Sequence, residues 1–388
     1  MAIVHAVFSL FMEVKKRRIK VLFTIPNFDT AGSGKALLNI ATRLNQESFE
    51  PMIACESEKG FFFKVVRESG IPIHIMKLTT SMSNRWSGLQ HVLRIAAAFR
   101  RIKPHIVHSF HYSADYSEAL AARLAGCKWV YTKKNMNWGG SSANGWKLRS
   151  WLANGIVAQN TDMFQFFGKS KKVSLIPRGV NVNEFAGKES DKIKIRVEFG
   201  IPENAKIILT VANLVPVKGI EVLMQAFNTL HPQLPEVHLV IVGDDTSDYA
   251  RSLKQLAAGS DARNQIHFTG KRTDVRDFLA AANVFVLPTL NQGRQEGSPV
   301  SLLEAMAAGK CVLASDVAGV RDQLQDFKTH LFAPGDDAML SAKLMEYLAL
   351  TDAELEQLGY RFRNHVTNNY TIEKEVKVHE QFYLDMCD

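Results

Sequence analysis

The stretch "EGSPVSLLEAMAAGKCVLAS", residues 296–315, holds the most informative pattern in this chain of 388 residues. Ser298 is expected to cap a helix, Pro299 suits its first position, and Gly309 is expected to end it. The residues between them are nearly all apolar or small, which is typical of a helix that is buried on every side. An apolar strand pattern, 310–315, follows at once. The stretch therefore predicts a buried helix that leads directly into a buried strand.

One charged residue, Glu304, interrupts this apolar pattern. It lies on the same stripe of the predicted helix as Val300, Leu303 and Ala307. A carboxylate in such surroundings is costly unless hydrogen-bond donors satisfy it. The hydroxyl groups of a bound ribose would serve, and a buried lysine or arginine is the alternative.

A second carboxylate, Glu296, lies in the loop just before this helix. From there it can reach a ligand held at the helix end, although capping a helix is the alternative. The backbone amides of Gly297 and Ser298 could meet an anion at the same place. The stretch therefore predicts a ligand site at the start of the helix.

Apolar strand patterns alternate with helical patterns on the rest of the chain. Continuous apolar strands separated by helices indicate parallel sheets covered on both faces. The predicted strands are 20–25, 50–55, 71–76, 105–110, 128–133, 155–159 and 172–177 in the first half, and 206–212, 237–243, 265–270, 283–288, 310–315 and 329–334 in the second.

A looser stretch rich in Gly, Asn, Lys and Asp, residues 176–205, is expected to connect the two series. Among the predicted helices are 88–102 and 114–126, and Gly126 suits the end of the latter. Periodicity thus predicts an α/β fold of two successive doubly wound, Rossmann-like domains. Because ligands of such sheets bind beyond the carboxyl ends of the strands, a cleft between the domains is the expected site.

A glycine-rich segment near the start, "FDTAGSGKALL" (28–38), suggests a phosphate-binding loop. The P-loop pattern fails at two positions, since Asp29 stands where the first glycine belongs and Ala36 replaces the metal-binding hydroxyl. Glycines before a helix still allow backbone amides to approach an anion or a sugar. A tight turn between a strand and a helix is the alternative.

Composition narrows the class of protein. The length favours two domains, and the composition, with 46% hydrophobic and 22% charged residues, is ordinary for a globular protein. A net charge of +8 fits attraction to nucleotides, phosphorylated acceptors or anionic lipids. The four cysteines are scattered, which predicts a reducing compartment and no structural zinc site.

The first residues, "MAIVHAVFSLFMEVKKRRIKV" (1–21), place an apolar run before a basic cluster, the reverse of a signal peptide. We expect a frayed extension, with an amphipathic surface anchor as the alternative and Met12 as an alternative start.

The spacing of Glu296 and Glu304, with seven residues between them, resembles the E-x7-E signature of retaining glycosyltransferases of family four, which have the GT-B fold. The resemblance extends over roughly residues 19–385. The other segments that carry it are "VANLVPVKGIEVLMQAF" (211–227), "VHLVIVGDD" (237–245), "IHFTGKRTDVRDFLAAANVFVLPT" (266–289) and "YTIEKEVKVHEQFYLDM" (370–386).

The resemblance implies a domain organisation. Residues 1–18 would form an N-terminal extension, and 19–180 a Rossmann-like domain on the acceptor side. Residues 181–368 would form the nucleotide-sugar domain, and the helix in 369–388 would cross back onto the first domain.

The resemblance also implies roles for single residues. Lys218 would contact the donor diphosphate, Glu304 the ribose and Glu296 the donor sugar, while Gly270 and Lys271 would line the base pocket through their backbone. Lys35 would be a residue of the first helical turn near phosphate. The donor-binding set implied in this way is Gly32, Ser33, Gly34, Asn213, Lys218, Gly270, Lys271, Glu296, Gly297, Ser298, Pro299, Val300 and Glu304.

The chain departs from the family pattern at two places. Asn213 stands where the family often has arginine, so that Lys218 or Arg294 would carry more of the charge on the diphosphate. Phe110 stands where the family has a histidine after the fourth strand. His111 is the first candidate to replace that histidine and His108 the second, and a core or surface position is the alternative for each.

The segment 132–151 mixes tryptophans with lysines, a combination that suits stacking on sugars or contact with a membrane interface. Its residues Trp138 and Lys134, together with His108 and His111, form the candidate acceptor site, and core packing is the alternative for Trp138.

Together these expectations describe a retaining glycosyltransferase with Glu296, His111 and Lys218 as the catalytic residues. It would move a sugar from a nucleotide-sugar, most simply a UDP-sugar, to a glycan, a lipid-linked acceptor or a small molecule in cell-envelope polysaccharide or lipopolysaccharide synthesis. No metal, cofactor or nucleic acid is expected, and the location would be cytoplasmic, with peripheral attachment to the inner face of the membrane as an option. The alternatives are a GT-B nucleotide-sugar epimerase, a non-catalytic nucleotide-binding protein and a P-loop nucleotide switch.

Overall fold

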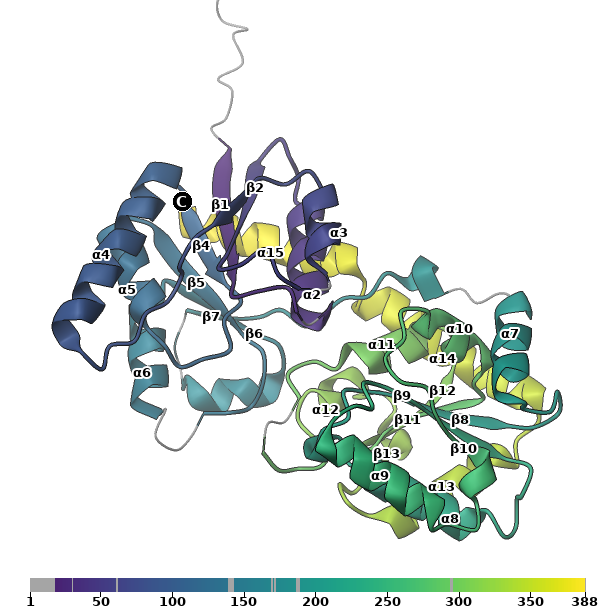
Figure 1. Ribbon diagram of the computed structural model, residues 1–388. Coiled ribbons are helices and arrows are strands. Elements are labelled where there is room, and N and C mark those ends of the chain that lie inside the picture. Colours follow the sequence, from purple (N-terminus) through teal and green to yellow (C-terminus); the bar gives the residue numbers. More distant parts are fainter. Residues whose placement is uncertain are drawn as a thin grey trace, which may run out of the picture.

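The computed structural model describes residues 18–387, except for residues 30, 61, 139–142, 169, 171, 186–188 and 294–295. The expectations for the N-terminal extension and for Arg294 therefore lie outside the described residues. Two α/β units follow one another along the chain, each built on one parallel sheet (Figure 1).

The first sheet has the strand order β3-β2-β1-β4-β5-β6-β7, and every pairing in it is parallel. The order reverses between β1 and β4, which creates the crevice where open α/β sheets bind ligands. The strands are β1 (Ile19–Ile25), β2 (Phe49–Cys55), β3 (Ile73–Ile75), β4 (Ile106–Ser109), β5 (Lys128–Lys133), β6 (Gly155–Ala158) and β7 (Val173–Leu175).

The second sheet repeats this topology in the order β10-β9-β8-β11-β12-β13. Its pairings are also parallel, and its switch point lies between β8 and β11. The strands are β8 (Ile207–Val211), β9 (His238–Val242), β10 (Ile266–Phe268), β11 (Val284–Leu287), β12 (Cys311–Ser315) and β13 (Leu331–Phe332). Each predicted strand coincides with one of the strands observed in the described residues.

Helices cover both faces of each sheet, so that apolar side chains of each strand pack in both directions. In the first unit α2, α3 and α15 share one core with the sheet, and α4, α5 and α6 share the other. The helices of this unit are α2 (Ala31–Arg43), α3 (Phe63–Glu68), α4 (Arg85–Ile102), α5 (Ser117–Leu124), α6 (Ala143–Leu152) and the C-terminal α15 (Ile372–Cys387).

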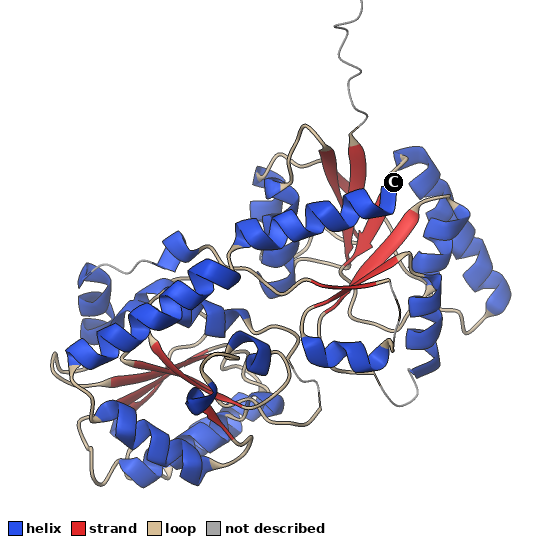
Figure 2. Ribbon diagram, turned by 180° about the vertical axis from the view of Figure 1, so that it is seen from behind, coloured by secondary structure: helices blue, strands red, loops and turns tan. Residues whose placement is uncertain are grey.

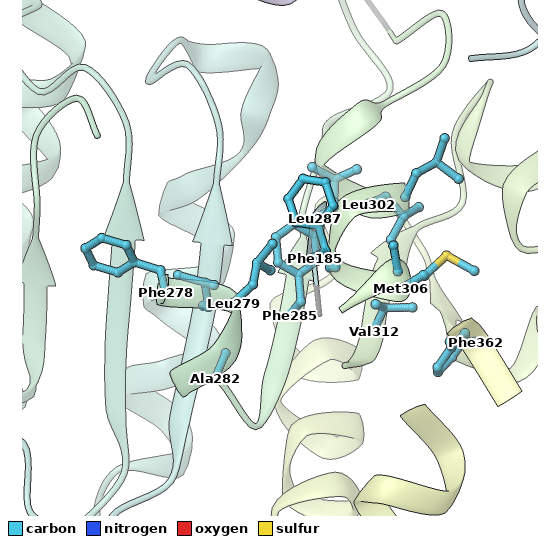
Figure 3. Packing of buried hydrophobic residues seen from close by; sticks show 14 of the residues in the cluster. Phe185, Phe278, Leu279, Ala282, Phe285, Leu287, Leu302, Met306, Val312 and Phe362 are labelled. Carbon is cyan, nitrogen blue, oxygen red and sulfur yellow. The ribbon is translucent and has the colours of Figure 1, made fainter. Parts of the chain in front are cut away.

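The second unit is covered in the same way, with α11 in the middle of one core. Leu302 and Met306 of α11 pack against Phe285 of β11, Val312 of β12 and Phe362 of α14 (Figure 3). The helices are α7 (Glu189–Phe199), α8 (Ile220–Leu230), α9 (Asp248–Ala258), α10 (Val275–Ala281), α11 (Val300–Ala307), α12 (Val320–Gln323), α13 (Asp337–Leu348) and α14 (Asp352–Asn369), with short 3-10 turns such as η3 (Val182–Phe185) and η4 (Pro216–Lys218) between them.

The C-terminal helix α15 returns to the first unit, as Figure 2 shows from behind. It packs on α2, and its Phe382 lies so close to β6 that a Cβ atom at Gly155 would come within 2.6 Å of the ring. The return is anchored by a buried ion pair at 3.1 Å between Arg178 and Glu375, which also accepts the amide of Gly179.

No helix in the part of the chain that the structure describes is long and apolar enough to span a bilayer. The four cysteines carry free thiols: Cys55, Cys127 and Cys311 are buried, and Cys387 is exposed.

Replacing Glu375 by leucine is expected to destabilise the first unit. The substitution leaves the buried guanidinium of Arg178 without its counterion, which costs about 3–5 kcal/mol when one partner of a buried pair is removed. Urea unfolding measures the loss as a shift of the first transition. Lys377→Leu, at an exposed position of the same helix, is the matched control, and equal transitions for the two variants would contradict the anchoring role.

Candidate functional site

The predicted site residues follow the carboxyl ends of several strands in both sheets. His111 follows β4, Lys134 follows β5, Asn213 follows β8 and Gly270 follows β10. Since parallel strands end at the same edge of a sheet, this arrangement gathers the loops of each unit, and polar contacts between the units form there.

Glu304 lies on α11, facing the first unit. Its carboxylate is 3.9 Å from the ammonium group of Lys35, which belongs to α2, and Lys35 also pairs with Glu184 of η3 at 3.3 Å. The side chain of Glu304 is 16% exposed and that of Lys35 is 41% exposed. Among the described residues, the cation paired with Glu304 is Lys35, which is half-exposed and belongs to the other unit.

Burial raises the pKa of Glu304 to about 7, against a usual value of 4.5. Lys35 lowers this pKa and Glu184 raises it, but both effects are smaller than that of burial. The carboxyl group therefore remains poorly compensated in the absence of a ligand, and it would gain from additional hydrogen-bond donors.

The second carboxylate, Glu296, forms an ion pair with Lys218. Both side chains are mostly buried, at 17% and 19% exposure. Lys218 is the last residue of η4, and one residue separates it from α8. Between them Gly219 has a φ of 60°, and a Cβ atom there would lie 2.2 Å from the carbonyl oxygen of Pro288.

The loop with Glu296 also docks onto the first unit. Glu296 forms an antiparallel bridge with Asn135, and the side-chain amide of Asn160 donates to the carbonyl of Gly297 at 2.6 Å. A Cβ atom at Gly297 would lie 2.3 Å from the carbonyl oxygen of Lys134, so only glycine permits this approach. The loop of the second unit is therefore packed directly against the first unit.

The predicted helix cap was wrong by one residue. Pro299, not Ser298, is the cap residue of α11, and no side chain caps that end. The hydroxyl of Ser298 instead accepts hydrogen bonds from Gln323 at 3.0 Å and from the amide of Arg178 at 3.3 Å. Val300 is the first residue of α11, and the helix ends before Gly309, whose φ is 68°.

We predicted that the glycine segment of the first unit forms a loop before a helix, but the structure places it inside the helix. Gly32, Ser33 and Gly34 lie in the first turn of α2, which begins at Ala31. Gly34 is needed for packing, because a Cβ atom there would lie 2.8 Å from the ring of Phe28. The P-loop interpretation fails on its sequence pattern, at Asp29 and Ala36, and Lys35 pairs with Glu184 and Glu304 in this structure.

Ser33 contributes to a polar cluster at the start of α2. Its hydroxyl bonds to that of Tyr112, and the ammonium group of Lys134 donates to it at 3.3 Å. Lys134 also lies 3.5 Å from the centre of the Tyr112 ring and donates to the carbonyl of Phe110. The cluster is a donor-rich surface beside the loop with Gly297.

The two candidate histidines differ in their surroundings. His108 is fully buried, and its ring nitrogens bond to Tyr383 at 2.6 Å and Thr132 at 2.8 Å, so the acceptor-binding role predicted for it is wrong. His111 is also buried, but its Nε2 has no hydrogen-bond partner among the described residues. Burial and, less strongly, Arg149 lower its pKa to about 3, so it is neutral at physiological pH.

Trp138 packs against other aromatic side chains of the first unit. Its ring stacks on Phe166 at 5.1 Å and on Trp146 at 5.7 Å, and Lys133 lies 3.8 Å from the centre of the Trp146 ring. This aromatic cluster consists of the first unit's own residues. Trp138 is only partly buried, and an acceptor contact of this side chain stays a prediction.

The remaining predicted residues lie on loops of the second sheet. Gly270 has a φ of 70°, and its carbonyl accepts the amide of Gly243 at 3.2 Å. The side chains of Lys271 and Asn213 are exposed. Nothing in this arrangement contradicts a contact through the backbone of Gly270, but no described contact ties these three residues to Glu304.

Three polar residues of the junction were missed by the sequence analysis: Tyr112, Asn135 and Asn160. Each directly follows or lies near the end of a predicted strand of the first sheet, which was the available signal. Within the described residues, no group of three or more His, Cys, Asp or Glu side chains could hold a metal ion.

Comparisons with known families cover most of the chain. Residues 191–365 match the family "Glycosyl transferases group 1", and residues 30–184 match "Glycosyltransferase Family 4". A galactosyltransferase of Escherichia coli acting on GlcNAc-diphosphoundecaprenol is 25% identical over 322 residues, which are 77% of this chain and 80% of that protein.

Another relative, the N-acetyl-alpha-D-glucosaminyl L-malate synthase of Bacillus anthracis, is 28% identical over 198 residues, 50% of each chain. The chain thus spans about half the length of this curated relative.

Solved structures share the architecture. A glycosyltransferase of Rickettsia africae superimposes with a TM-score of 0.84 at 19% identity, covering 96% of this chain and 99% of that one. Anabaena HepE in complex with UDP superimposes with a TM-score of 0.81 at 19% identity, covering 95% and 100%. These likenesses show the GT-B fold. The two family matches show that the chain is a glycosyltransferase, with a family-four first half and a group 1 second half.

Proposed function

We propose that this chain is a retaining glycosyltransferase that moves a sugar from a nucleotide-sugar, in the first place a UDP-sugar, to an acceptor of the cell envelope. The observation that carries the proposal is the undercompensated carboxyl group of Glu304, placed at the junction of two Rossmann-like units. A ribose would offer two hydroxyl donors to this group, which neither Lys35 nor Glu184 supplies.

Relatives support this choice of donor and acceptor. HepE of Anabaena has been solved with UDP and with UDP-glucose, and the E. coli relative uses UDP-galactose and a lipid-linked acceptor. A Salmonella relative is a lipopolysaccharide N-acetylglucosaminetransferase, whereas two mycobacterial relatives depend on GDP-mannose. UDP-sugars are therefore the first donors to test, and GDP-sugars the second.

The proposed binding mode exchanges protein contacts for ligand contacts. The ion pair between Lys218 and Glu296 would open, so that Lys218 meets the diphosphate and Glu296 a hydroxyl of the donor sugar. As the bond to the sugar breaks, negative charge develops on the diphosphate, and Lys218 together with the N-terminal amides of α8 would stabilise it. No metal is assigned to this step.

The first unit would hold the acceptor. Ser33, Tyr112 and Lys134 form a donor-rich cluster beside the loop with Glu296, and the unsatisfied Nε2 of His111 lies two residues beyond β4. A neutral imidazole can bond to a sugar hydroxyl without adding charge near the reacting carbon. We therefore propose that His111 positions the acceptor through a hydrogen bond to one of its hydroxyl groups.

The substitution Glu304→Gln tests the ribose contact. Losing a hydrogen bond to a charged group costs about 1.5–3 kcal/mol, so UDP affinity should fall about tenfold or more. In the unmodified chain UDP affinity should rise with pH through about 7, where Glu304 ionises, and the variant should lose this dependence. Calorimetry over pH 5.5–8.5 measures both effects, and an unchanged UDP affinity in a folded variant would refute the role.

The same group predicts a stability change. The folded chain keeps the proton of Glu304 up to a pKa of about 7, whereas the unfolded chain releases it near 4.5. Unfolding therefore releases a proton between these values, and the contribution of this group falls as pH rises through them. The Glu304→Gln chain should gain stability over the unmodified chain on going from pH 5 to pH 8, as thermal unfolding without ligand would measure.

The substitution Lys218→Ala tests the diphosphate contact. It should weaken UDP binding about tenfold to a hundredfold, because a charge-assisted contact with phosphate is lost, and it should affect uridine binding much less. Lys328→Ala, at an exposed lysine of the same unit, is the control. Equal losses for UDP and uridine would assign Lys218 a structural role instead.

A donor and acceptor screen separates the remaining activities. Thermal shift across UDP-, GDP- and ADP-sugars should identify the donor, and acceptor-dependent release of the nucleoside diphosphate should then follow. Conversion of the donor to an epimer without an acceptor would favour the epimerase, and binding without either reaction the non-catalytic alternative. Release that persists in EDTA would support metal independence.

A further inference from the structure

The loop that connects β4 with α5, residues 110–116, is bound from inside the first unit by a buried arginine. Arg149 of α6 donates to the hydroxyl of Ser109 at 3.2 Å, directly before the loop. It also donates to the backbone carbonyl of Asp115 at 2.7 Å, near the end of the loop. Two nitrogens of one guanidinium group therefore bind both ends of this loop, which the planar fork of arginine allows.

A buried carboxyl group completes the arrangement. Glu118 belongs to α5, which lies beside α6 on one face of the first sheet (Figure 1). It accepts a hydrogen bond from the hydroxyl of Ser109 and another from Thr24 of β1, both at 2.5 Å. All four side chains, including that of Arg149, are 0% exposed. The hydroxyl of Ser109 thus connects the guanidinium group with the carboxyl group.

Aromatic rings hold the guanidinium group in place. Its central carbon lies 4.9 Å from the ring centres of Trp129 and Tyr131, which belong to β5, and 5.8 Å from that of Trp146. The hydroxyl of Tyr131 also bonds to Ser150 of α6 at 2.7 Å. Stacking on aromatic faces is a contact that arginine makes readily. The position of Arg149 is therefore fixed by the strand and the helix on which these rings lie.

This arrangement is a poor source of net stability. Burial raises the pKa of Glu118 and lowers that of Arg149, because the charged form of each group loses water. The attraction between the two groups opposes both changes, but it is the smaller effect. Replacing such a pair by uncharged side chains of similar volume is often neutral or stabilising. What the charged groups supply is the geometry that they impose on the loop.

The loop carries two residues of the acceptor side. The backbone amide of His111 lies 3.5 Å from the hydroxyl of Ser109, and Nε2 of its ring has no hydrogen-bond partner among the described residues. Tyr112 is 42% exposed, and its hydroxyl bonds to that of Ser33 in α2. A displacement of the loop would move both side chains away from their present positions.

We propose that Arg149, by clamping both ends of loop 110–116, is a positioning residue for the acceptor. It fixes where His111 and Tyr112 lie, and it acts only through the loop because it is itself buried. The proposal deepens the proposed function and rests on it, since it takes the loop to contact the acceptor. Small displacements of reacting groups are enough to slow a reaction, so loosening this loop should slow transfer.

The double substitution Arg149→Met with Glu118→Gln separates positioning from stability. It removes both charges together, so neither is left buried alone, and thermal unfolding should stay close to that of the unmodified chain. Hydrogen exchange followed by mass spectrometry, without any ligand, should become about tenfold or more faster in residues 110–116. Exchange in β2 and in the second unit should stay unchanged.

Kinetics with the donor and acceptor identified by the screen provide the second measurement. The double variant should raise the KM for the acceptor, and kcat/KM for the acceptor should fall about tenfold to a hundredfold. Calorimetry should show an unchanged affinity for UDP, whose proposed contacts, Lys218 and Glu304, lie in the second unit. Arg149→Lys keeps the charge beside Glu118 but lacks the fork that binds both ends of the loop, so it should also raise the KM for the acceptor.

Lys147→Met is the matched control, because it removes an exposed cation from the same helix. It should leave loop exchange, UDP affinity and transfer unchanged. Three results would overturn the proposal: unchanged exchange of residues 110–116 in the double variant, faster exchange with an unchanged KM for the acceptor, or a loss of UDP affinity as large as the loss of transfer. Absence of transfer in the unmodified chain would instead refute the proposed function, and the exchange measurement would still show whether Arg149 clamps the loop.

Discussion

A carboxylate held in an apolar helix is the constraint on which the site depends. Within its own unit, α11 offers Glu304 a packed core on one side and Glu184 nearby, which raises the cost of its charge. Among the described residues, the cation paired with Glu304 is a half-exposed lysine of α2 across the junction. The ionisation of Glu304 therefore links the affinity for a ligand to pH and to the contact between the two units.

The junction itself is polar, whereas each unit has its own apolar cores. Thr161 donates through its backbone amide to Asp322 at 2.6 Å, and Arg321 pairs with Asp162 at 2.9 Å. Exposed contacts of this kind contribute little stability individually and exchange readily with water. An interface built from them suits two units that must let substrates enter and leave between them.

Backbone approach, rather than side-chain chemistry, fixes where the loops of the site lie. Gly297 allows its loop to touch the chain after β5, and Gly219 allows the turn before α8 to touch the chain after β11. Larger residues at either place would push Glu296 or Lys218 away from its present position. The distance between the two charged groups is therefore set by residues that carry no functional group themselves.

The sequence by itself determined the architecture, and it singled out two carboxylates, Glu296 and Glu304, as candidates. Periodicity located every strand, because buried parallel strands are continuous apolar runs that stand out from helical patterns, and it marked Glu304 because a charge within such a pattern is rare. The limits of the domains and the roles of single residues stay predictions.

Only the tertiary structure decided which polar residues meet. His108 looked like a ligand-binding residue, yet Tyr383, from a distant part of the chain, holds it in the core. The same folding left Nε2 of His111 without a hydrogen-bond partner in the described part of the chain, and it brought Lys35 near Glu304. Local sequence fixes backbone periodicity, but the partner of a polar side chain depends on contacts between residues far apart in the chain, which no local pattern encodes.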